Sequence, residues 1–369
     1  MFTVVICAYS LGRWDELAES VESVLTQSHP AQELLVVIDH CDVLLTRVRA
    51  EFPEIRVIAS ERGRGTSAAR NTGLRHATTP VVAFLDDDAW ADPDWLAALA
   101  PWYDDPNTMG VGGHIEPRWE GERPSWFPPE LLWVVGGTHL GTPTTVAPVR
   151  NFFGSNMSFR REALGAVGGF REEMGRIGRA RWTCEETEAA ILVSQSRPGS
   201  VLLHVPEARV EHQARHMYTT WRYLIQRCWV EGRAKALVSQ HVGRTAGLAS
   251  ERTYVTRVLP AGVARGVWDA VRGDVAGLAR SAAIVLGLSV TTVSYVYGSA
   301  VGRAGRLRPG RDPAARRLTV GEGQAPKAGP SSNGALAGAP SDDAAAVPSD
   351  DAPAARSGDA PDDRDRAAR

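Results

Sequence analysis

The alternation of short apolar runs with longer amphipathic stretches over residues 2–110 is the feature that most constrains the fold of this chain. The apolar runs predict strands at residues 2–8, 34–38, 55–59 and 81–85. The stretches between and after them carry apolar residues at helical spacing and predict helices at residues 13–27, 44–51, 68–75 and 93–103. Regular alternation of strand and helix is typical of an α/β fold with a mostly parallel central sheet. The stretch contains neither a P-loop nor the glycine-rich dinucleotide fingerprint.

Three carboxylates, Asp86, Asp87 and Asp88, directly follow the fourth apolar run. Carboxylates are too costly to bury without partners, and ligands of open α/β sheets collect at the carboxyl ends of strands. The first and third residues of an extended triplet point the same way, so Asp86 and Asp88 can converge on one target. Hard carboxylate oxygens suit Mg²⁺ or Mn²⁺, ions that usually arrive with phosphate. The other interpretation is a solvated turn in which an Asp caps a helix before Trp90.

Polar or small residues also end the first two predicted strands. Ala8 and Tyr9 end the first, and Asp39 ends the second. In a parallel sheet these ends lie side by side, near Asp86, where an acidic residue can hydrogen-bond a base or ribose. Asp39 taken alone is equally typical of a helix cap or a turn.

A glycine-rich, arginine-containing loop at residues 62–65 leads into the third predicted helix. Exposed N–H groups at a helix start, together with arginines such as Arg70, form a site for an anionic diphosphate. The alternative is a flexible basic loop with Thr66 or Ser67 as the helix cap.

Composition restricts the partners of the chain. A net charge of −2 over 369 residues gives no general attraction to nucleic acid, so no nucleic-acid partner is expected. The four cysteines show no C-x-x-C pair, which is typical of reduced thiols in a cytosolic protein. The first apolar run is too short for a signal peptide and no basic region precedes it, so we expect the catalytic part to be cytoplasmic or to face the cytoplasm.

The rest of the chain is less regular. Residues 111–150 contain six prolines and three spaced tryptophans and predict a long functional loop, and a helix is predicted at residues 218–235. Residues 281–302 carry no charged side chain and are long enough to span a bilayer. Their Gly, Ser and Thr residues lower the hydrophobicity, so a membrane-spanning helix, an interfacial helix and a soluble apolar helix all remain open. Membrane contact is favoured because arginines follow this segment. The Ala-, Pro- and Asp-rich residues 304–369 predict a disordered tail.

The motifs named above, together with two later ones, occur in one order along the chain. They are Ala8-Tyr9, Asp39, Arg70-Asn71 with Gly73, Asp86-Asp87-Asp88, residues 154–160 and residues 185–188. This ordered set resembles the family 2 glycosyltransferases of the GT-A fold, which transfer a sugar from a nucleotide diphosphate with inversion. The resemblance covers roughly residues 1–235 and implies a catalytic domain there, followed by a helical membrane-associating segment at 236–303 and the tail at 304–369.

The resemblance also implies roles for individual residues. Those expected to hold the donor nucleotide are Ala8, Tyr9, Asp39, Arg70, Asp86 and Asp87. Asp88 would bind the divalent cation, and His212 matches a further metal or diphosphate contact, although a lone His after a strand is usually a surface residue. Gly154, Ser155 and Asn156 match the stretch that positions donor and acceptor sugars.

The catalytic base of the family corresponds to Glu186, where the usual residue is Asp. Because Glu is one methylene longer, Glu185 remains a second candidate, and an acidic cluster that merely stabilises a helix start is the alternative. Residues 226–229 only loosely match the Gln-x-x-Arg-Trp element of processive synthases, which argues against a polymerising enzyme.

The expected activity is therefore metal-dependent transfer of one sugar from a nucleotide-diphosphate donor, UDP by resemblance, to a lipid-linked or cell-surface glycan acceptor. A polyprenyl-linked acceptor and a membrane surface are the expected partners, at the cytoplasmic face of the membrane. Two alternatives remain open: a sugar-1-phosphate nucleotidyltransferase, and an inactive scaffold that binds sugar nucleotide or glycan.

Overall fold

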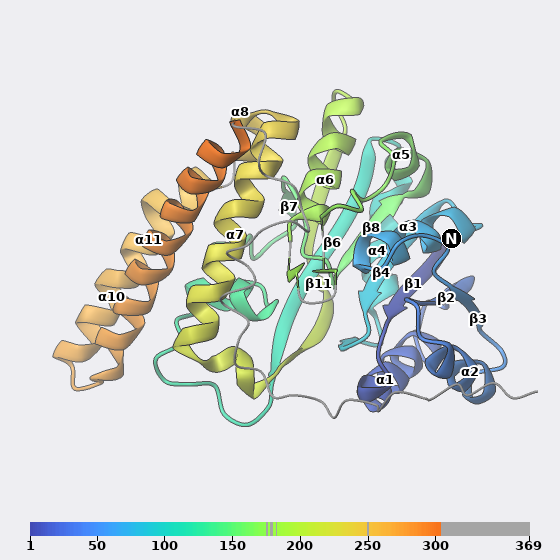
Figure 1. Ribbon diagram of the computed structural model, residues 1–369, viewed down its shortest axis with the longest axis horizontal. Coiled ribbons are helices and arrows are strands. Elements are labelled where there is room, and N and C mark those ends of the chain that lie inside the picture. Colours follow the sequence, from blue (N-terminus) through green and yellow to red (C-terminus); the bar gives the residue numbers. More distant parts are fainter. Residues whose placement is uncertain (175, 178–179, 182, 249–250, 304–369) are drawn as a thin grey trace, which may run out of the picture. The chain divides into compact units, whose positions relative to one another are not determined.

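The computed structural model describes residues 1–303 except 175, 178–179, 182 and 249–250. Within the described residues, one nine-stranded sheet has the order β3-β2-β1-β4-β8-β6-β11-β5, and β7 pairs with β11 (Figure 1). Its strands are β1 Phe2–Ala8, β2 Glu33–Ile38, β3 Arg56–Ala59, β4 Val81–Asp86, β5 Ala89–Ala91, β6 Thr108–Trp119, β7 Ala147–Pro148, β8 Met157–Arg160 and β11 Val201–Ala214. The first four strands are parallel as predicted, β6 and β11 are also parallel, and the other pairings are antiparallel.

Helices cover the sheet and extend beyond it. They are α1 Trp14–Leu25, α2 Asp42–Glu51, α3 Thr66–His76, α4 Trp95–Leu99, α5 Arg161–Ala166, α6 Glu185–Ser196, α7 Trp221–Val242, α8 Arg244–Gly247, α9 Glu251–Thr253, α10 Leu259–Val271 and α11 Ala276–Arg303. Short 3-10 helices are η1 Leu11–Arg13, η2 Ala100–Asp104, η3 Pro129–Val135 and η4 His216–Thr219. The segment η5 Tyr254–Val258 is a π-helix. A separate two-stranded sheet pairs β9 Arg176–Ile177 with β10 Ala180–Arg181. The helix predicted at residues 93–103 is shorter than expected because Pro101 supplies no N–H, and η2 replaces its second half.

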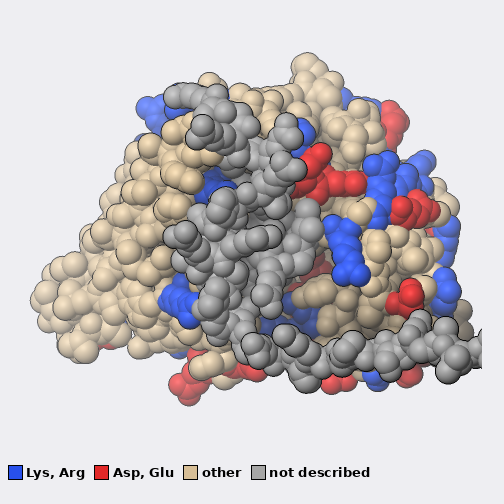
Figure 2. Space-filling view, in the orientation of Figure 1, with Lys and Arg blue, Asp and Glu red and all other residues tan. Residues whose placement is uncertain are grey.

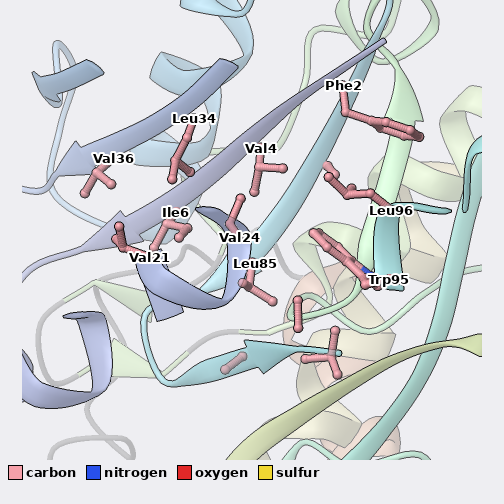
Figure 3. Packing of buried hydrophobic residues seen from close by; sticks show 14 of the residues in the cluster. Phe2, Val4, Ile6, Val21, Val24, Leu34, Val36, Leu85, Trp95 and Leu96 are labelled. Carbon is pink, nitrogen blue, oxygen red and sulfur yellow. The ribbon is translucent and has the colours of Figure 1, made fainter. Parts of the chain in front are cut away.

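The core lies on both faces of the sheet, which explains why its strands are continuously apolar. Val4 and Ile6 of β1 belong to the cluster beneath α1 and α4, where Trp95 is fully buried (Figure 3). Val5 of the same strand joins the opposite cluster, which contains Phe84. Alternate residues of one strand thus serve two cores, as expected when helices cover both faces of a sheet.

The prediction of a loop throughout residues 111–150 is wrong for its first part, because β6 continues to Trp119. Glycines rather than large apolar residues occupy the start of this strand. A Cβ at Gly112 would collide with the ring of Phe152, and one at Gly113 would collide with the carbonyl of Ala208. The strand lacks the apolar signal because its neighbours approach too closely for side chains.

The C-terminal helices form a separate layer on α7. The α10–α11 hairpin packs on α7 through α11, and Gly232 of α7 lies against Thr291 of α11 (Figure 1). Among the described residues, one helical stretch, Ala276–Gly302, is long and apolar enough to span a membrane. The predicted boundary at residue 235 falls inside α7, and the division at that point stays a prediction. The predicted disordered tail, residues 304–369, lies outside the described residues.

Candidate functional site

A cavity of about 280 Å³ opens where the carboxyl ends of β1, β2 and β4 meet. The strand register places these ends together, since Ala8 pairs with Ile38 and Cys7 with Asp86. The predicted site residues that line the cavity are Ala8, Tyr9, Asp39, Arg70, Asp86, Asp87, Asp88, Gly154, Ser155, Glu185, Glu186 and His212. Strand ends, Arg70 of α3, residues 154–155, the start of α6 and His212 of β11 therefore contribute to one site.

Asn156 is the exception, and its predicted sugar contact needs correction. The side chain is buried, its Oδ1 accepts a hydrogen bond from Trp95 Nε1 at 2.9 Å, and its Nδ2 donates to the carbonyls of His114 and Ala208. These bonds tie α4, β6 and β11 together. Asn156 follows Ser155 directly but its side chain enters the core, because the two residues lie in a turn closed by the hydrogen bond from Asn156 N to the Phe153 carbonyl, just before β8 begins.

Asp86, Asp88 and His212 form a candidate cation site. One ligand atom from each lies within 4.8 Å of the others. His212 reaches the triplet because β11 pairs with β5, which places His212 opposite Ala89. Its Nε2 lies 3.3 Å from Asp88 Oδ1. Two carboxylates and an imidazole are a donor set that fits Mn²⁺ or Mg²⁺.

Arg13 is a cavity residue that the sequence analysis missed. Its NH1 lies 2.8 Å from Asp87 Oδ1 and 3.1 Å from Asp88 Oδ2, so one guanidinium contacts two members of the triplet. Burial and the charge of Asp88 raise the pKa of Asp87, and Arg13 opposes this shift. The signal was a basic residue in the turn after the first strand, where side chains face the ends of neighbouring strands.

Arg70 links three parts of the site from the buried face of α3. Its guanidinium donates to Asp86 Oδ1 and to Glu185 Oε1, both at 2.9 Å, and to the carbonyl of Gly154 at 3.2 Å. A Cβ at Gly154 would lie 2.8 Å from Arg70 NH2, so glycine permits this close approach. Arg70 therefore holds the end of β4, the start of α6 and the segment around Gly154 together.

The first turn of α6 carries three glutamates that differ in their partners. Glu185 is paired with Arg70, and Glu188 is fully buried and paired with Arg171 and His241. Glu186 lines the cavity and makes no ion pair with any residue that the structure describes. Burial and the charge of Glu185 raise the pKa of Glu186 to about 8. Of the three, Glu186 is the one that lines the cavity without an ion pair to a basic residue that the structure describes.

An aromatic wall, which includes one tryptophan of the predicted loop, also lines the cavity. It consists of Trp133, Phe153, Tyr218 and Tyr223, with Arg227 beside them. Tyr218 and Tyr223 stack with ring centroids 4.6 Å apart, and the Arg227 guanidinium lies 5.4 Å from the Trp133 ring. Aromatic faces suit stacking against a sugar, and Arg227 is held beside them by an ion pair with Glu231 at 2.7 Å.

The other two tryptophans of the predicted loop have packing roles. Trp126 stacks on Trp221 with centroids 4.4 Å apart, and Trp119 packs edge-on against Phe127. Only the position of Trp133, at the end of η3 next to α7, brings it to the cavity.

Comparison with known proteins gives consistent results. The family model described as "Glycosyl transferase family 2" matches residues 3–168. A glucosyl-dolichyl phosphate glucuronosyltransferase of Haloferax volcanii is 34% identical over 240 residues, which are 64% of this chain and 76% of that protein. A pre-mycofactocin glycosyltransferase of Mycobacterium tuberculosis is 30% identical over 203 residues, 53% of this chain and 39% of its own length. Among solved structures, a mannosyltransferase from Pyrobaculum calidifontis aligns with a TM-score of 0.48 and 19% identity, covering 79% of this chain and 86% of that one.

Proposed function

We propose, from the premise that the chain belongs to glycosyl transferase family 2, that it is an inverting, metal-dependent enzyme that moves one sugar from a nucleotide-diphosphate donor to a lipid-linked acceptor. The proposal rests on one observation: the Asp86–Asp88–His212 cluster and Glu186 line the same cavity. A cation site and a carboxylate of raised pKa are the two groups that a direct displacement at a sugar carbon needs.

The donor is proposed to lie along the strand ends. Ala8, Tyr9 and Asp39 would face the nucleoside, with Asp39 fixed by the Gly65 N–H at 2.8 Å. Asp86, Asp88 and His212 would hold Mg²⁺ or Mn²⁺, which supplies positive charge to the departing diphosphate. Arg13 is adjacent to the same carboxylates and would contribute a further positive charge there.

Glu186 is proposed to take the proton from the attacking hydroxyl of the acceptor. A base that acts during the attack typically accelerates the reaction by a factor of ~10²–10⁴. One carboxylate suffices for inversion, because no covalent intermediate has to form and break, as in inverting glycosidases. Glu185 is the weaker candidate, since Arg70 already binds its carboxylate.

The acceptor is proposed to enter along the aromatic wall. Tyr223 and Arg227 lie on α7, the helix on which the apolar α11 packs, so the acceptor side of the cavity is continuous with the apolar C-terminal layer. The Haloferax relative is named for a glucosyl-dolichyl phosphate acceptor, which is a sugar on a lipid phosphate. We therefore propose an acceptor of this class, with its sugar against Trp133 and its lipid toward α10 and α11.

Membrane contact is proposed for the α10–α11 hairpin. Apolar side chains at its tip are exposed, in particular Val271 at 75% and Val275 at 76%. Arg280 pairs with Asp269 and Asp274, so both acidic groups of the tip are ion-paired within the hairpin. Figure 2 shows an almost uncharged surface over the hairpin. These features fit insertion into the edge of a bilayer, and the cytoplasmic side stays a prediction.

The first test is titration of UDP and GDP into the full chain with and without Mn²⁺, followed by transfer from UDP-glucuronic acid to a glucosyl polyprenyl phosphate. We expect Mn²⁺-dependent nucleotide binding, and we expect Asp88→Ala to abolish it in a variant that still folds. Absence of nucleotide binding by the folded protein would overturn the donor site. Release of pyrophosphate instead of a nucleoside diphosphate would indicate a nucleotidyltransferase, and binding without any turnover would indicate the scaffold.

A further inference from the structure

We propose that Glu231 of α7 is a positioning residue that fixes the start of α6 and thereby directs Glu186 into the cavity. The inference rests on the proposed role of Glu186 as the catalytic base. It concerns a residue on another helix, which contacts the two residues that precede α6.

Each carboxylate oxygen of Glu231 holds one of those two residues. Cys184 Sγ donates to Glu231 Oε1 at 3.5 Å, and Thr183 Oγ1 donates to Glu231 Oε2 at 3.3 Å. The Glu231 side chain is 12% exposed, so these contacts are largely shielded from water. Both residues lie directly before the glutamates of the first turn of α6.

The start of α6 requires such support. Cys184 occupies the N-cap position with a φ of 73°, in the left-handed region that residues other than glycine rarely adopt. Its side chain makes no capping hydrogen bond to the helix. The thiol is directed to Glu231 instead, so α7 supplies the contact that holds this unusual backbone conformation.

Glu231 is itself held in place from both sides along α7. Arg227 NH1 lies 2.7 Å from its Oε2, and Lys235 Nζ lies 3.5 Å from its Oε1. Although burial opposes ionisation, Arg227 and Lys235 lower the pKa of Glu231 to about 2, so the residue stays charged. Lys235 also contacts Glu251 at 2.6 Å, and Glu251 contacts Arg150 at 2.7 Å. The ion pairs therefore extend from the cavity wall to α9.

The charge of Glu231 also acts on Glu186. Among the described residues, the charged groups that influence Glu186 include Glu185 on its own helix, Arg70 on α3 and Glu231 on α7. Burial and Glu185 are the main causes of the raised pKa of Glu186; Glu231 adds to the shift, and Arg70 opposes it. Neutralising Glu231 must therefore lower the pKa of Glu186, an effect that a loss of packing alone would not produce.

The test is Glu231→Gln in the full chain, assayed with UDP-glucuronic acid and glucosyl polyprenyl phosphate over a range of pH. We expect kcat to fall at least 10-fold, the affinity for UDP with Mn²⁺ to stay unchanged, and the acidic limb of the pH–kcat profile to move to lower pH. Glu251→Gln is the matched control, because it breaks the same network away from α6. It should lower the melting temperature without moving the acidic limb.

Cys184→Ala tests the same contact from the other side and remains informative if Glu231→Gln does not fold. It should lower kcat several-fold without shifting the pH profile, since the charge of Glu231 remains. Wild-type kcat in each of these variants that folds would overturn the positioning role. Failure of the proposed function is distinguished by Glu186→Gln: if that variant keeps full turnover, the base assignment is wrong whatever Glu231 does.

Discussion

Replacing Arg70 by Met separates two roles for this residue, a structural link within the protein and a direct contact to the donor. In the wild type its guanidinium is only 5% exposed and serves Asp86 Oδ1, Glu185 Oε1 and the Gly154 carbonyl. Breaking a buried ion pair by removing one partner typically costs about 3–5 kcal/mol. The Glu185 side chain is 9% exposed, so it would be left as a charge without solvent. Against a total stability of about 5–15 kcal/mol, this loss is large.

Urea unfolding of Arg70→Met, Glu185→Met and the double variant measures this loss as a double-mutant cycle. We expect Arg70→Met to lower the free energy of unfolding by about 3–5 kcal/mol, and the double variant to lose at least about 1.5 kcal/mol less than the sum of the single changes. Arg197→Met, which removes a surface ion pair with Glu162, is the control and should cost below about 1 kcal/mol. Unchanged stability in Arg70→Met together with a large loss of UDP affinity would refute the structural link and favour a nucleotide contact.

Two further predictions concern the base and the hairpin. Glu186→Gln should lower kcat by a factor of ~10²–10⁴ with unchanged UDP affinity. Only the ionised carboxylate accepts a proton, and the pKa of Glu186 is raised to about 8, so turnover of the wild type should rise with pH up to about pH 8. A pH-independent turnover would contradict the assignment of Glu186 as the base. The double change Val271→Asp/Val275→Asp removes about 3 kcal/mol of apolar burial in a bilayer and should weaken binding to phosphatidylglycerol vesicles roughly 100-fold. Val43→Asp, at a valine of α2 that is 66% exposed, should have no effect.

The fold of the N-terminal half was predictable because its strands are buried on both faces and are continuously apolar. The register then made the site predictable: parallel strands that start together end together, which brings Ala8, Asp39 and Asp86 to one edge. β6 was not predictable in this way, because Phe152 and Ala208 approach its backbone so closely that glycines replace the apolar side chains. Periodicity carries no information at positions that have no side chain.

The acceptor side of the cavity could not be predicted from local patterns. Tyr223 and Arg227 reach it only because α7 packs beside η3 and α6, and such packing between distant segments leaves no local signal. His212 was expected from the family pattern alone, and its approach to Asp88 depends on the pairing of β11 with β5. The different directions of Ser155, which lines the cavity, and Asn156, which enters the core, could not be predicted either, because they depend on the turn that leads into β8.

The longer base of this chain leads to a last prediction. The family pattern has Asp where this chain has Glu186, so Glu186→Asp restores the ordinary residue and keeps the charge. It also retracts the carboxylate by about 1.5 Å, the length of one C–C bond. The start of α6 is fixed by the hydrogen bond from Cys184 to Glu231 and by the ion pair between Glu185 and Arg70. The helix therefore cannot move toward the cavity to compensate for the shorter side chain. A displacement of about 1 Å can cost a factor of ~10² in rate. We therefore expect kcat of Glu186→Asp to fall by about that factor, with UDP affinity unchanged. Wild-type turnover in this variant would show that the start of α6 can move to compensate for the shorter side chain. It would thereby contradict the proposal that Glu231 fixes the start of this helix.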